Sequence, residues 1–511
     1  MYDAKNGLWV AHCQDGPLSI IGKMANRHGL VAGATGTGKT VTLQVLAETF
    51  CQAGVPCFMA DMKGDLSGIS QPGRLSGFIE KRMAEFGIEA PRFQSCPVRF
   101  YDVFGQQGHP LRCTVSQMGP QLLSRVLGLN DTQEGVLNIV FRIADERGLL
   151  LLDIKDLRSM LNYVQAHASE YSSVYGNIAS ASVGAIQRSI LTLENEGADQ
   201  FFGEPSFDIQ DLLACEGGKG VMSVLAADRL MMKPKLYSTF LLWLLSELYS
   251  TLPEVGDMDL PKLVFFFDEA HMLFDDTPKA LTDKIEQVVR LIRSKGVGVY
   301  FVTQSPTDIP ESILGQLGNR VQHALRAFTP KDQKAVKVAA ETFRANPAFD
   351  TSEAIMNLGT GEALVSFLDE KGAPGVVQKA KILFPLSQIG AIDASQRSQL
   401  IKSSRIYGKY DTPVDRESAF EVLLAQAKET EKKSAKGGGL FGKLAKAVFT
   451  AVTASVAASV GTAVSNKVAG GKTQKTKKVS TGNKVVKSAT SAATRTVTRE
   501  LSRSILGNLI K

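Results

Sequence analysis

The chain has 511 residues, of which 44% are hydrophobic and 21% charged, values that exclude a globally disordered chain and a protein with many membrane spans. This length allows two or three domains, or one large α/β domain with insertions. The net charge of +7 is unevenly distributed, because residues 431–511 hold sixteen lysines or arginines against two acidic residues. That is a net +14, which leaves −7 for residues 1–430. Long-range attraction to a polyanion is therefore expected from the C-terminal region.

The cysteines and the N-terminus both bear on the cellular compartment. The six cysteines show no paired spacing, which is typical of free thiols in a reducing compartment. The first residues, MYDAKNGLWVAHCQDG, lack the basic and then apolar order of a signal peptide. The sequence therefore predicts a cytoplasmic protein.

Short apolar and β-branched runs alternate with helical stretches along most of the chain. This alternation is typical of a mainly parallel sheet with crossover helices. Polar or glycine residues follow several of the runs, and ligands bind at the carboxyl ends of strands in such sheets. The predicted strands are residues 29–32, 56–60, 98–103, 221–225, 263–267, 299–303, 324–327 and 363–367.

The apolar spacing becomes helical between residues 115 and 215, which predicts a helical insertion within the sheet domain. Residues 236–252 are strongly apolar, but the stretch is short and holds polar residues, which favours a buried core helix over a membrane span. The predicted organisation is a first part of the sheet domain at 1–114, the insertion at 115–215, the second part at 216–429 and a tail at 430–511.

The predicted tail is rich in Lys, Ser, Thr, Ala, Gly and Val, a composition typical of a flexible segment. Residues 447–466 carry no charge but contain no Leu or Ile, which favours a disordered or partner-binding segment over a membrane span. No aromatic residue follows Phe449, so any nucleic-acid binding by the tail would be electrostatic. A role in solubility alone is the alternative.

The sequence GATGTGKT lies between the 29–32 run and a helical stretch, the context that a phosphate-binding loop requires. Its glycines let backbone N–H groups point at phosphate oxygens, and the following helix adds its positive N-terminal end. We expect Lys39 to reach the β- and γ-phosphates of ATP and Thr40 to bind Mg²⁺. The predicted nucleotide-binding residues are Gly33, Ala34, Thr35, Gly36, Thr37, Gly38, Lys39 and Thr40.

The sequence KLVFFFDEAH ends a uniformly apolar run in two carboxylates, which predicts a central strand buried on both faces. Asp268 is placed to hold Mg²⁺ and its water shell, and Glu269 to polarise the water that attacks the γ-phosphate. The alternative is that the two acids begin a loop or cap a helix. Gln304 follows another predicted strand, and its amide could sense the γ-phosphate, or simply be a polar residue leaving the strand.

These residues together resemble the HerA/FtsK group of P-loop ATPases, which are hexameric DNA translocases with a RecA-like fold. The resemblance covers residues 26–367. Within the group, the sequence is most similar in detail to the YjgR-like subgroup. The segments that carry it are NRHGLVAGATGTGKTVTLQ, ADMKGDLSG, FFFDEAH, RSKGVGVYFVTQSPTDIP and LGTGEALVSF, and IYGKYDTPVDRESAFE resembles the C-terminal end of that subgroup.

The resemblance implies ATP and Mg²⁺ as cofactors, a homohexamer, and a catalytic set made of Lys39, Glu269, Gln304 and Arg293. Arg293 would act in trans on the nucleotide of a neighbouring subunit. Arg320 is a weaker candidate for that role. The acidic and basic residues of ADMKGDLSG, namely Asp61, Lys63 and Asp65, receive no assigned role.

The chain also differs from the DNA-pumping members of that group. Only 32 residues precede Gly33, too few for an N-terminal β-barrel, and no winged-helix module is recognisable towards the C-terminus. The leading hypothesis is an ATP-hydrolysing DNA translocase or helicase-like motor. The first alternative is an ATP-dependent switch or remodelling ATPase that acts on a protein partner, and the second is a scaffold that binds nucleotide without hydrolysis. Intact Lys39, Asp268 and Glu269 argue against the scaffold.

Overall fold

The computed structural model describes residues 2–3, 7–89, 91–256, 258–274 and 279–434. The chain divides into two compact units. Met1–Leu111 and Phe207–Asp411 form the sheet unit, whereas Arg112–Ser206 and Thr412–Lys511, described as far as Ser434, form the helical unit. The predicted basic segment from residue 435 onward, including the uncharged stretch at 447–466, lies outside the described residues.

Thirteen of the described strands of the sheet unit form one sheet in the order β1-β2-β15-β14-β13-β4-β12-β11-β5-β10-β6-β7, with β3 paired to β2. All pairs from β13 to β7 are parallel, which confirms the predicted mainly parallel α/β fold. The strands are β1 Tyr2–Asp3, β2 Gly7–Cys13, β3 Gly16–Ile20, β4 Gly29–Ala32, β5 Cys57–Asp61, β6 Val98–Asp102, β7 His109–Pro110, β10 Met222–Ala226, β11 Leu263–Phe267, β12 Val297–Thr303, β13 Asn319–Gln322, β14 Glu362–Ser366 and β15 Gln378–Ile382.

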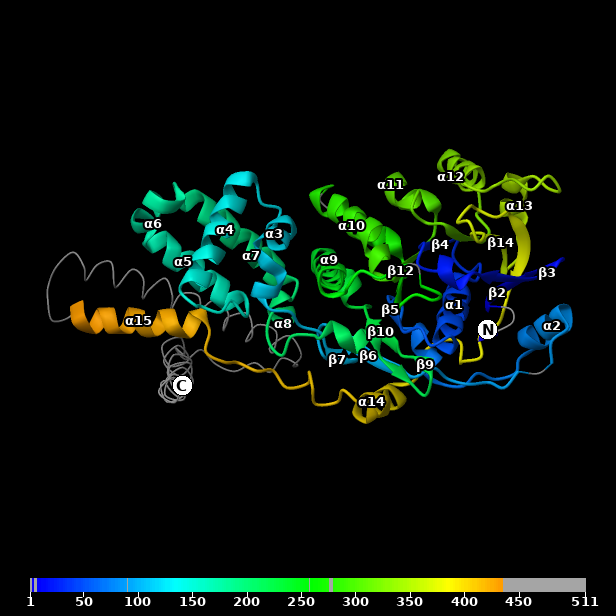
Figure 1. Cartoon of the computed structure of the whole chain (residues 1–511), viewed down its shortest axis with the longest axis horizontal. Coiled ribbons are helices and arrows are strands. Elements are labelled where there is room, and N and C mark those ends of the chain that lie inside the picture. Colours follow the sequence, from blue (N-terminus) through cyan, green and yellow to red (C-terminus); the bar gives the residue numbers. More distant parts are fainter. Residues whose placement is uncertain (1, 4–6, 90, 257, 275–278, 435–511) are drawn as a thin grey trace, which may run out of the picture. The chain divides into compact units, whose positions relative to one another are not determined.

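Helices cover both faces of the central strands. Alternate residues of β11 and β12, such as Phe266 and Tyr300, pack with α1 (Lys39–Gln52) in one hydrophobic cluster. On the opposite face Phe58 packs against Phe240 of α9 (Pro234–Thr251), and α10 (Lys279–Ile292) lies beside α9 (Figure 1). All five residues of β11 are buried, as expected for a strand covered on both sides.

The other short elements of the sheet unit connect these layers. Its remaining helices are α2 Gly77–Phe86, α11 Glu311–Leu314, α12 Pro330–Glu341, α13 Thr351–Asn357 and α14 Ala394–Ser403. Its 3-10 helices are η1 Gly22–Met24, η2 Leu66–Ser70, η3 Ile209–Leu213, η4 Leu230–Met232, η5 Ala270–Leu273, η6 Arg293–Lys295 and η7 Pro306–Asp308. A separate hairpin is formed by β8 Cys215–Glu216 and β9 Lys219–Gly220.

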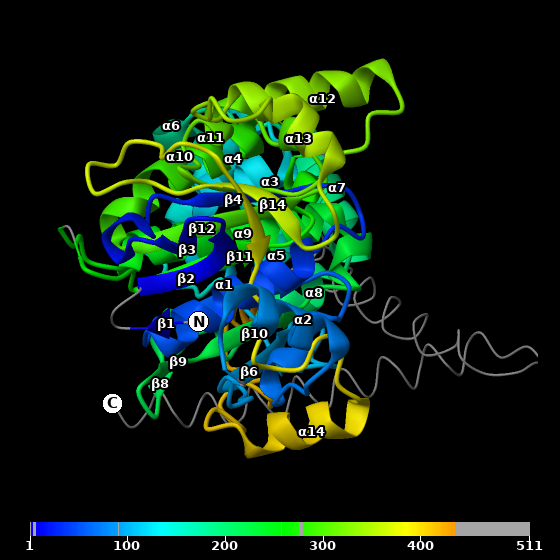
Figure 2. The ribbon, with the colours of Figure 1, turned by 90° about the vertical axis from the view of Figure 1, so that its right-hand side faces the viewer.

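Parallel registry brings the ends of four strands to one edge of the sheet. Ala32 of β4 pairs with Thr303 of β12, and Phe267 of β11 pairs with Ala60 of β5. The strands follow one another from β4 through β12 and β11 towards β10 and β6 (Figure 2). The segments that leave β4, β5, β11 and β12 therefore emerge on the same side, where ligands bind in sheets of this kind.

The predicted strand at residues 324–327 is wrong, because the strand at this place is β13, five residues earlier in the chain. β13 lies between β4 and β14 in the sheet. Its polar Asn319 is tolerated inside the sheet because the side-chain amide donates hydrogen bonds to Met24 O at 2.9 Å and His28 O at 3.2 Å. The apolar Ala324 and Leu325 instead pack in a separate small cluster.

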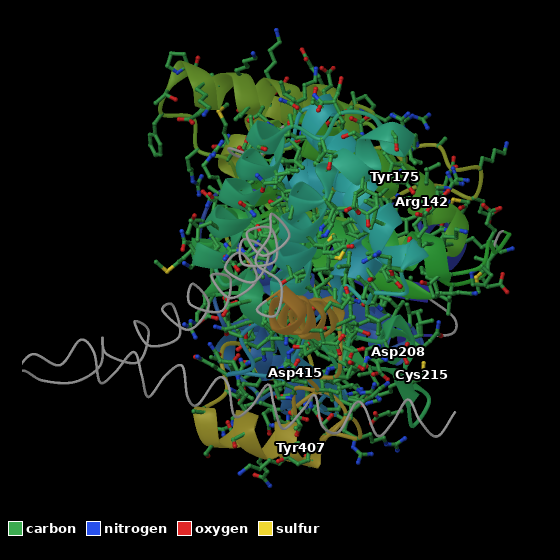
Figure 3. The ribbon with its side chains drawn as sticks, turned by 90° about the vertical axis from the view of Figure 1, so that its left-hand side faces the viewer. Arg142, Tyr175, Asp208, Cys215, Tyr407 and Asp415 are labelled. Carbon is green, nitrogen blue, oxygen red and sulfur yellow. The ribbon has the colours of Figure 1, made fainter. Side chains whose placement is uncertain are left out.

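The helical unit is built from α3 Val115–Leu127, α4 Asp131–Glu146, α5 Ile154–Ala166, α6 Ala168–Tyr175, α7 Ser180–Asn195, α8 Ala198–Phe201 and α15 Ala419–Ser434. α4 begins with a capping box in which Asn130 and Gln133 bond to each other's backbone. On its surface, Arg142 of α4 and Tyr175 of α6 lie near each other (Figure 3), and both donate hydrogen bonds to Glu146.

The helix α15 belongs to this unit because buried polar groups attach its first turn to α5. The carboxylate of Asp156 accepts hydrogen bonds from Ser418 Oγ at 2.5 Å and from Phe420 N at 3.0 Å. Lys155 adds an ion pair with Asp415 at 2.7 Å. Among the helices that the structure describes, none combines the length and apolar character needed to cross a membrane.

Candidate nucleotide site

The loop between β4 and α1 has the backbone of a phosphate cradle. Gly36 and Gly38 adopt φ angles of 78° and 112°, a region that side-chain-bearing residues rarely occupy. The loop closes on itself because Thr37 Oγ1 donates a hydrogen bond to Ala34 O at 2.7 Å. Thr35 is exposed and Thr40 is half-buried in the first turn of α1. All eight predicted loop residues therefore lie in one turn that wraps the N-terminus of a helix.

Lys39 is held inside this loop. Its Nζ donates hydrogen bonds to Gly33 O at 2.7 Å and to Ala34 O at 3.1 Å, and the residue is 8% exposed. Burial lowers the pKa of Lys39, while the negative charges of Glu269 and Asp268 act in the opposite direction. A cation in this position can bind phosphate oxygens that enter the loop.

His323 packs against Gly33 of the loop, a contact that the sequence analysis did not identify. It directly follows β13, and its ring nitrogens lie 2.8 Å from Thr42 Oγ1 and 3.0 Å from Glu362 O. Burial lowers the pKa of His323 to about 4, so the ring is neutral at pH 7. The sequence analysis missed this contact because it placed the strand at residues 324–327, after His323, whereas the strand is β13 and its neighbour is β4.

Asp268 and Glu269 follow β11 directly, and one strand, β12, separates them from β4. Asp268 is 3% exposed, and its Oδ1 accepts a hydrogen bond from Glu269 N at 3.0 Å. Its Oδ2 has no hydrogen-bond partner among the described residues. Burial and the neighbouring charge of Glu269 raise the pKa of Asp268 to about 6. An unpartnered buried carboxylate oxygen is suited to a cation or to water that a cation holds.

Glu269 has a left-handed backbone, with φ of 46° and ψ of 48°, which is unusual for a residue with a side chain. Its Oε1 lies 2.5 Å from Lys63 Nζ, and its Oε2 accepts a hydrogen bond from Gln304 Nε2 at 3.3 Å. His271 lies 3.4 Å from Oε2. Burial opposes ionisation of Glu269, but the hydrogen bonds from Lys63 and Gln304 outweigh it and leave the pKa below its usual value.

The ADMKGDLSG segment, which had no assigned role, forms the turn that follows β5. Asp61 accepts hydrogen bonds from Gly64 N at 2.8 Å and Leu66 N at 3.3 Å, so it braces the turn. Burial and the charge of Asp65 raise the pKa of Asp61 to about 7. The turn brings Lys63 to Glu269, so Lys63 belongs to the site and was missed by the sequence analysis.

The two arginine candidates lie elsewhere. Arg293 precedes β12 in η6, at the opposite end of that strand from Gln304, so this chain does not bring it to its own Lys39. Arg320 donates hydrogen bonds from its guanidinium to the backbone oxygens of Leu317, Leu314 and Thr342 at 2.9 to 3.2 Å. These contacts make Arg320 a brace for the segments around β13.

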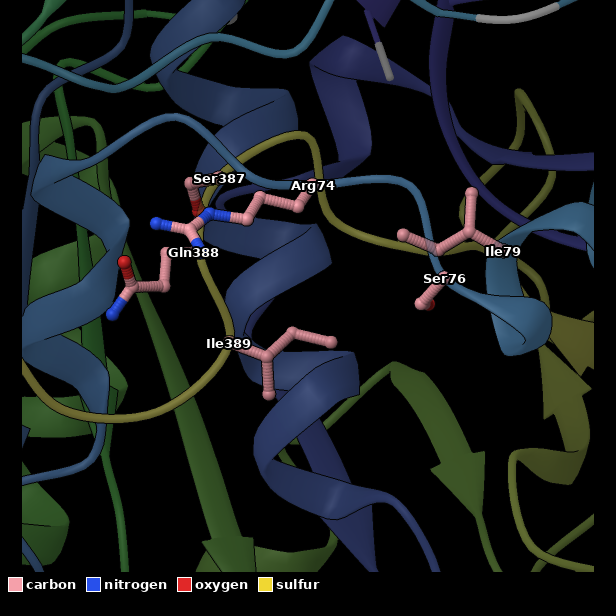
Figure 4. A pocket seen from close by; sticks show the side chains of 6 residues that line it. All are labelled: Arg74, Ser76, Ile79, Ser387, Gln388 and Ile389. Atoms are coloured by element: carbon pink, nitrogen blue, oxygen red, sulfur yellow. The ribbon is translucent and has the colours of Figure 1, made fainter.

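A pocket of 390 Å³ is lined in part by the segment that follows β15 (Figure 4). The buried Glu48 of α1 accepts hydrogen bonds from two backbone groups of this segment, Leu386 N at 2.7 Å and Ser387 N at 2.9 Å. This fixes the segment around Ser387 to the helix that begins at the phosphate cradle. The residues that line the pocket are Arg74, Ser76, Ile79, Ser387, Gln388 and Ile389.

Comparison with known protein families gives a match over nearly the whole chain. Residues 8–511 match the family model described as helicase HerA-like C-terminal. The chain is 32% identical over 99 residues to the DNA double-strand break repair helicase HerA of Sulfolobus acidocaldarius, and 33% identical over 109 residues to that of Sulfurisphaera tokodaii. These alignments span 19% and 21% of the two relatives, and the same shares of this chain.

Two solved structures have a partly similar chain path, and both have low sequence identity to this chain. The bacterial conjugative coupling protein TrwB is 18% identical, with a TM-score of 0.46 over 74% of this chain and 89% of TrwB. VirB4 of Thermoanaerobacter pseudethanolicus is 15% identical, with a TM-score of 0.45 over 78% of this chain and all of the VirB4 chain.

Proposed function

The chain belongs to the helicase HerA-like C-terminal family, and on that premise we propose that it is an ATP-hydrolysing motor that acts on DNA. The main support for the proposal is that two groups of residues lie at the same edge of the sheet. The first is the phosphate cradle after β4, and the second is the carboxylate pair Asp268 and Glu269 after β11. A single edge thus offers both phosphate binding and water activation.

ATP and Mg²⁺ fit the residues present. The backbone N–H groups of residues 33–40 and the ammonium group of Lys39 hold the phosphates, while Thr40 and Asp268 supply oxygens for the metal. The unpartnered Oδ2 of Asp268 supports this assignment. Mg²⁺, when bound, offsets the negative charge of the phosphates.

Glu269 is the residue proposed to orient and polarise the attacking water. Its carboxylate is ionised at neutral pH, because the pKa is held below its usual value by Lys63 and Gln304 after opposing burial. Gln304 contacts Glu269 directly and is exposed, so its amide can respond to a group bound in the cradle. The two residues then form one unit that connects the nucleotide to the segment after β12.

We extend the proposal to a ring, the arrangement in which Arg293 can act on a nucleotide. Because Arg293 lies at the far end of β12 from the cradle of its own chain, it can reach a nucleotide only in a neighbouring subunit. A homohexamer with heterologous interfaces provides such a site at every interface. Native mass measurements with and without ATP and DNA test this: a hexamer supports the proposal, and a monomer under all conditions contradicts it.

DNA is the proposed substrate. The names of the HerA relatives support it, and so does the excess of basic residues in the C-terminal region. The test is ATP turnover with and without excess duplex DNA over a series of salt concentrations. We expect stimulation that declines as salt rises, because phosphate contacts release counterions. Turnover that DNA leaves unchanged even at low ionic strength would contradict a DNA motor.

The second candidate is an ATP-dependent remodelling ATPase that acts on a protein partner. It is favoured by the net charge of −7 over residues 1–430, which gives the body of the chain no general attraction to DNA. A stoichiometric protein that stays bound after nuclease treatment, together with ATP turnover that is insensitive to DNA, would favour this candidate over the first.

A further inference from the structure

Lys63 and Glu269 meet because their strands are neighbours. β5 and β11 pair in parallel with Ala60 opposite Phe267, so the turn after β5 passes beside the residues that follow β11. In this arrangement Lys63 Nζ lies 2.5 Å from Glu269 Oε1, and Gln304 Nε2 lies 3.3 Å from Oε2. Both carboxylate oxygens of Glu269 are therefore engaged by other side chains rather than directed at the phosphate cradle alone.

The two partners differ sharply in exposure. The side chain of Lys63 is 48% exposed, whereas that of Glu269 is 7% exposed. The ammonium group of Lys63 can therefore move into solvent and stay hydrated. The left-handed backbone of Glu269, in contrast, fixes the position from which its side chain extends. The mobile member of the pair is the lysine.

We propose that Lys63 is a positioning residue that restrains Glu269 in the resting chain and that its release frees the carboxylate to orient the attacking water. This inference rests on the proposed ATPase function. Lys63 is exposed, so an anionic group of the substrate can compete with Glu269 for its ammonium. DNA phosphate is the group that the proposed substrate supplies.

An alternative role for Lys63 makes the opposite prediction. If Lys63 binds a phosphate of ATP, its removal lowers turnover or raises KM. If it restrains Glu269, its removal raises turnover in the absence of DNA and leaves KM nearly unchanged. The split between kcat and KM therefore separates the two roles.

The test compares Lys63→Ala with Lys63→Arg and with the control Lys409→Ala. The side chain of Lys409 is similarly exposed, at 43%, and its Nζ lies 2.8 Å from Asp211 Oδ2. This ion pair does not involve Glu269. We expect Lys63→Ala to raise DNA-independent kcat about two- to fivefold, the range for a partly exposed ion pair. The ratio of stimulated to basal turnover falls accordingly. Lys409→Ala keeps the basal rate of the wild type, and Lys63→Arg, which retains the positive charge, should show a smaller rise than Lys63→Ala.

A second variant excludes a new route to hydrolysis. The double variant Lys63→Ala/Glu269→Gln should bind ATP but lose the raised turnover, because that turnover passes through Glu269. Lower kcat, raised KM or an unchanged stimulation ratio in Lys63→Ala would overturn the restraint while leaving the ATPase proposal intact. If neither the wild type nor Lys63→Ala hydrolyses ATP, both the ATPase proposal and the restraint fail.

Discussion

His323 lies directly against Gly33, and a Cβ atom added to Gly33 would sit 2.5 Å from the Cβ of His323. Real Cβ atoms do not approach so closely, and the φ of 155° adds strain to any substitution at Gly33. The cradle is thus shaped by the side chain of the residue that follows β13 as well as by its own glycines.

Gly33→Ala should displace the cradle from His323 and weaken ATP binding by about tenfold or more, which corresponds to roughly 1.4 kcal/mol. Equilibrium binding of a fluorescent ATP analogue measures the effect. The matched control is Gly135→Ala in α4, where a Cβ meets nothing within 4 Å and binding should not change. Equal affinity in Gly33→Ala and the wild type would contradict the close packing.

Glu269→Gln should lower kcat about a hundredfold or more, because the amide cannot accept a proton from water. ATP affinity should stay near that of the wild type, since the cradle is untouched. Steady-state turnover and equilibrium binding are measured side by side. A variant that hydrolyses ATP as fast as the parent would refute the assignment of Glu269 as the activating carboxylate.

Arg293→Ala should lose ATP turnover while it keeps ATP binding, because the arginine is proposed to act on the neighbouring subunit. Mixing Arg293→Ala with Glu269→Gln in equal amounts should restore up to about a quarter of the wild-type rate, since random rings place an intact arginine beside an intact carboxylate. Each variant alone is the control. The absence of recovery after exchange of subunits would indicate that Arg293 does not act in trans.

His28 gives a pH-dependent prediction. The buried ring accepts a hydrogen bond from Val299 N at 3.0 Å through Nδ1 and contacts Val289 O at 2.8 Å through Nε2. Burial lowers the pKa of His28 to about 4, and the charge of Arg293 lowers it further, whereas the bond to Val289 opposes the shift. As pH falls, the His28 ring therefore becomes protonated near pH 6.5 in the unfolded chain, but only near pH 4 in the folded chain.

The stabilising effect of His28 is consequently complete above about pH 6.5 and falls as pH decreases towards 4, by at most about 1.4 kcal/mol per pH unit. His28 has a left-handed backbone, with φ of 58°. Asn tolerates this conformation, so His28→Asn is the variant to use. It should be less stable than the wild type by about 1–3 kcal/mol at neutral pH. That difference should shrink at pH values near 5. Denaturant unfolding at both pH values measures it, and a constant difference would contradict the buried neutral ring.

Asp156→Ala should weaken the attachment of α15 in the helical unit. The buried carboxylate accepts hydrogen bonds from Ser418 and from the backbone N–H groups of Phe420 and Leu152. Its removal leaves buried donors unpaired, at a cost of about 2–4 kcal/mol. Limited proteolysis within Ala419–Ser434 should become faster. Asp156→Asn, which keeps one side-chain oxygen, is the milder control, and equal cleavage of all three proteins would contradict the prediction.

The central strands could be predicted from sequence because burial on both faces leaves an unbroken apolar run. Leu263–Phe267 has the predicted bounds for this reason. β13 was misplaced because Asn319 and Gln322 satisfy their polarity through specific hydrogen bonds, which apolarity alone does not reveal. β2, β3 and β15 were missed because strands near the edge of a sheet need not be uniformly apolar.

The same distinction holds at the site. The phosphate cradle and the two carboxylates are local in sequence, so their chemistry could be predicted from spacing. The contacts of Lys63 with Glu269 and of His323 with Gly33 join residues far apart in the chain. These contacts depend on which strands are neighbours in the sheet, and the strand order cannot be predicted from any single segment of the sequence.

The pairing of β2 with β15 has a consequence for biosynthesis. Ala11 lies opposite Ile382, so β2 can join the rest of the sheet only after β15, the last described strand of the sheet, has been made. A chain emerging from the ribosome would carry the β2–β3 hairpin with one open edge until residue 382 is made. Such an edge invites pairing with other chains, so this end of the molecule is where chaperone protection would be needed most during synthesis.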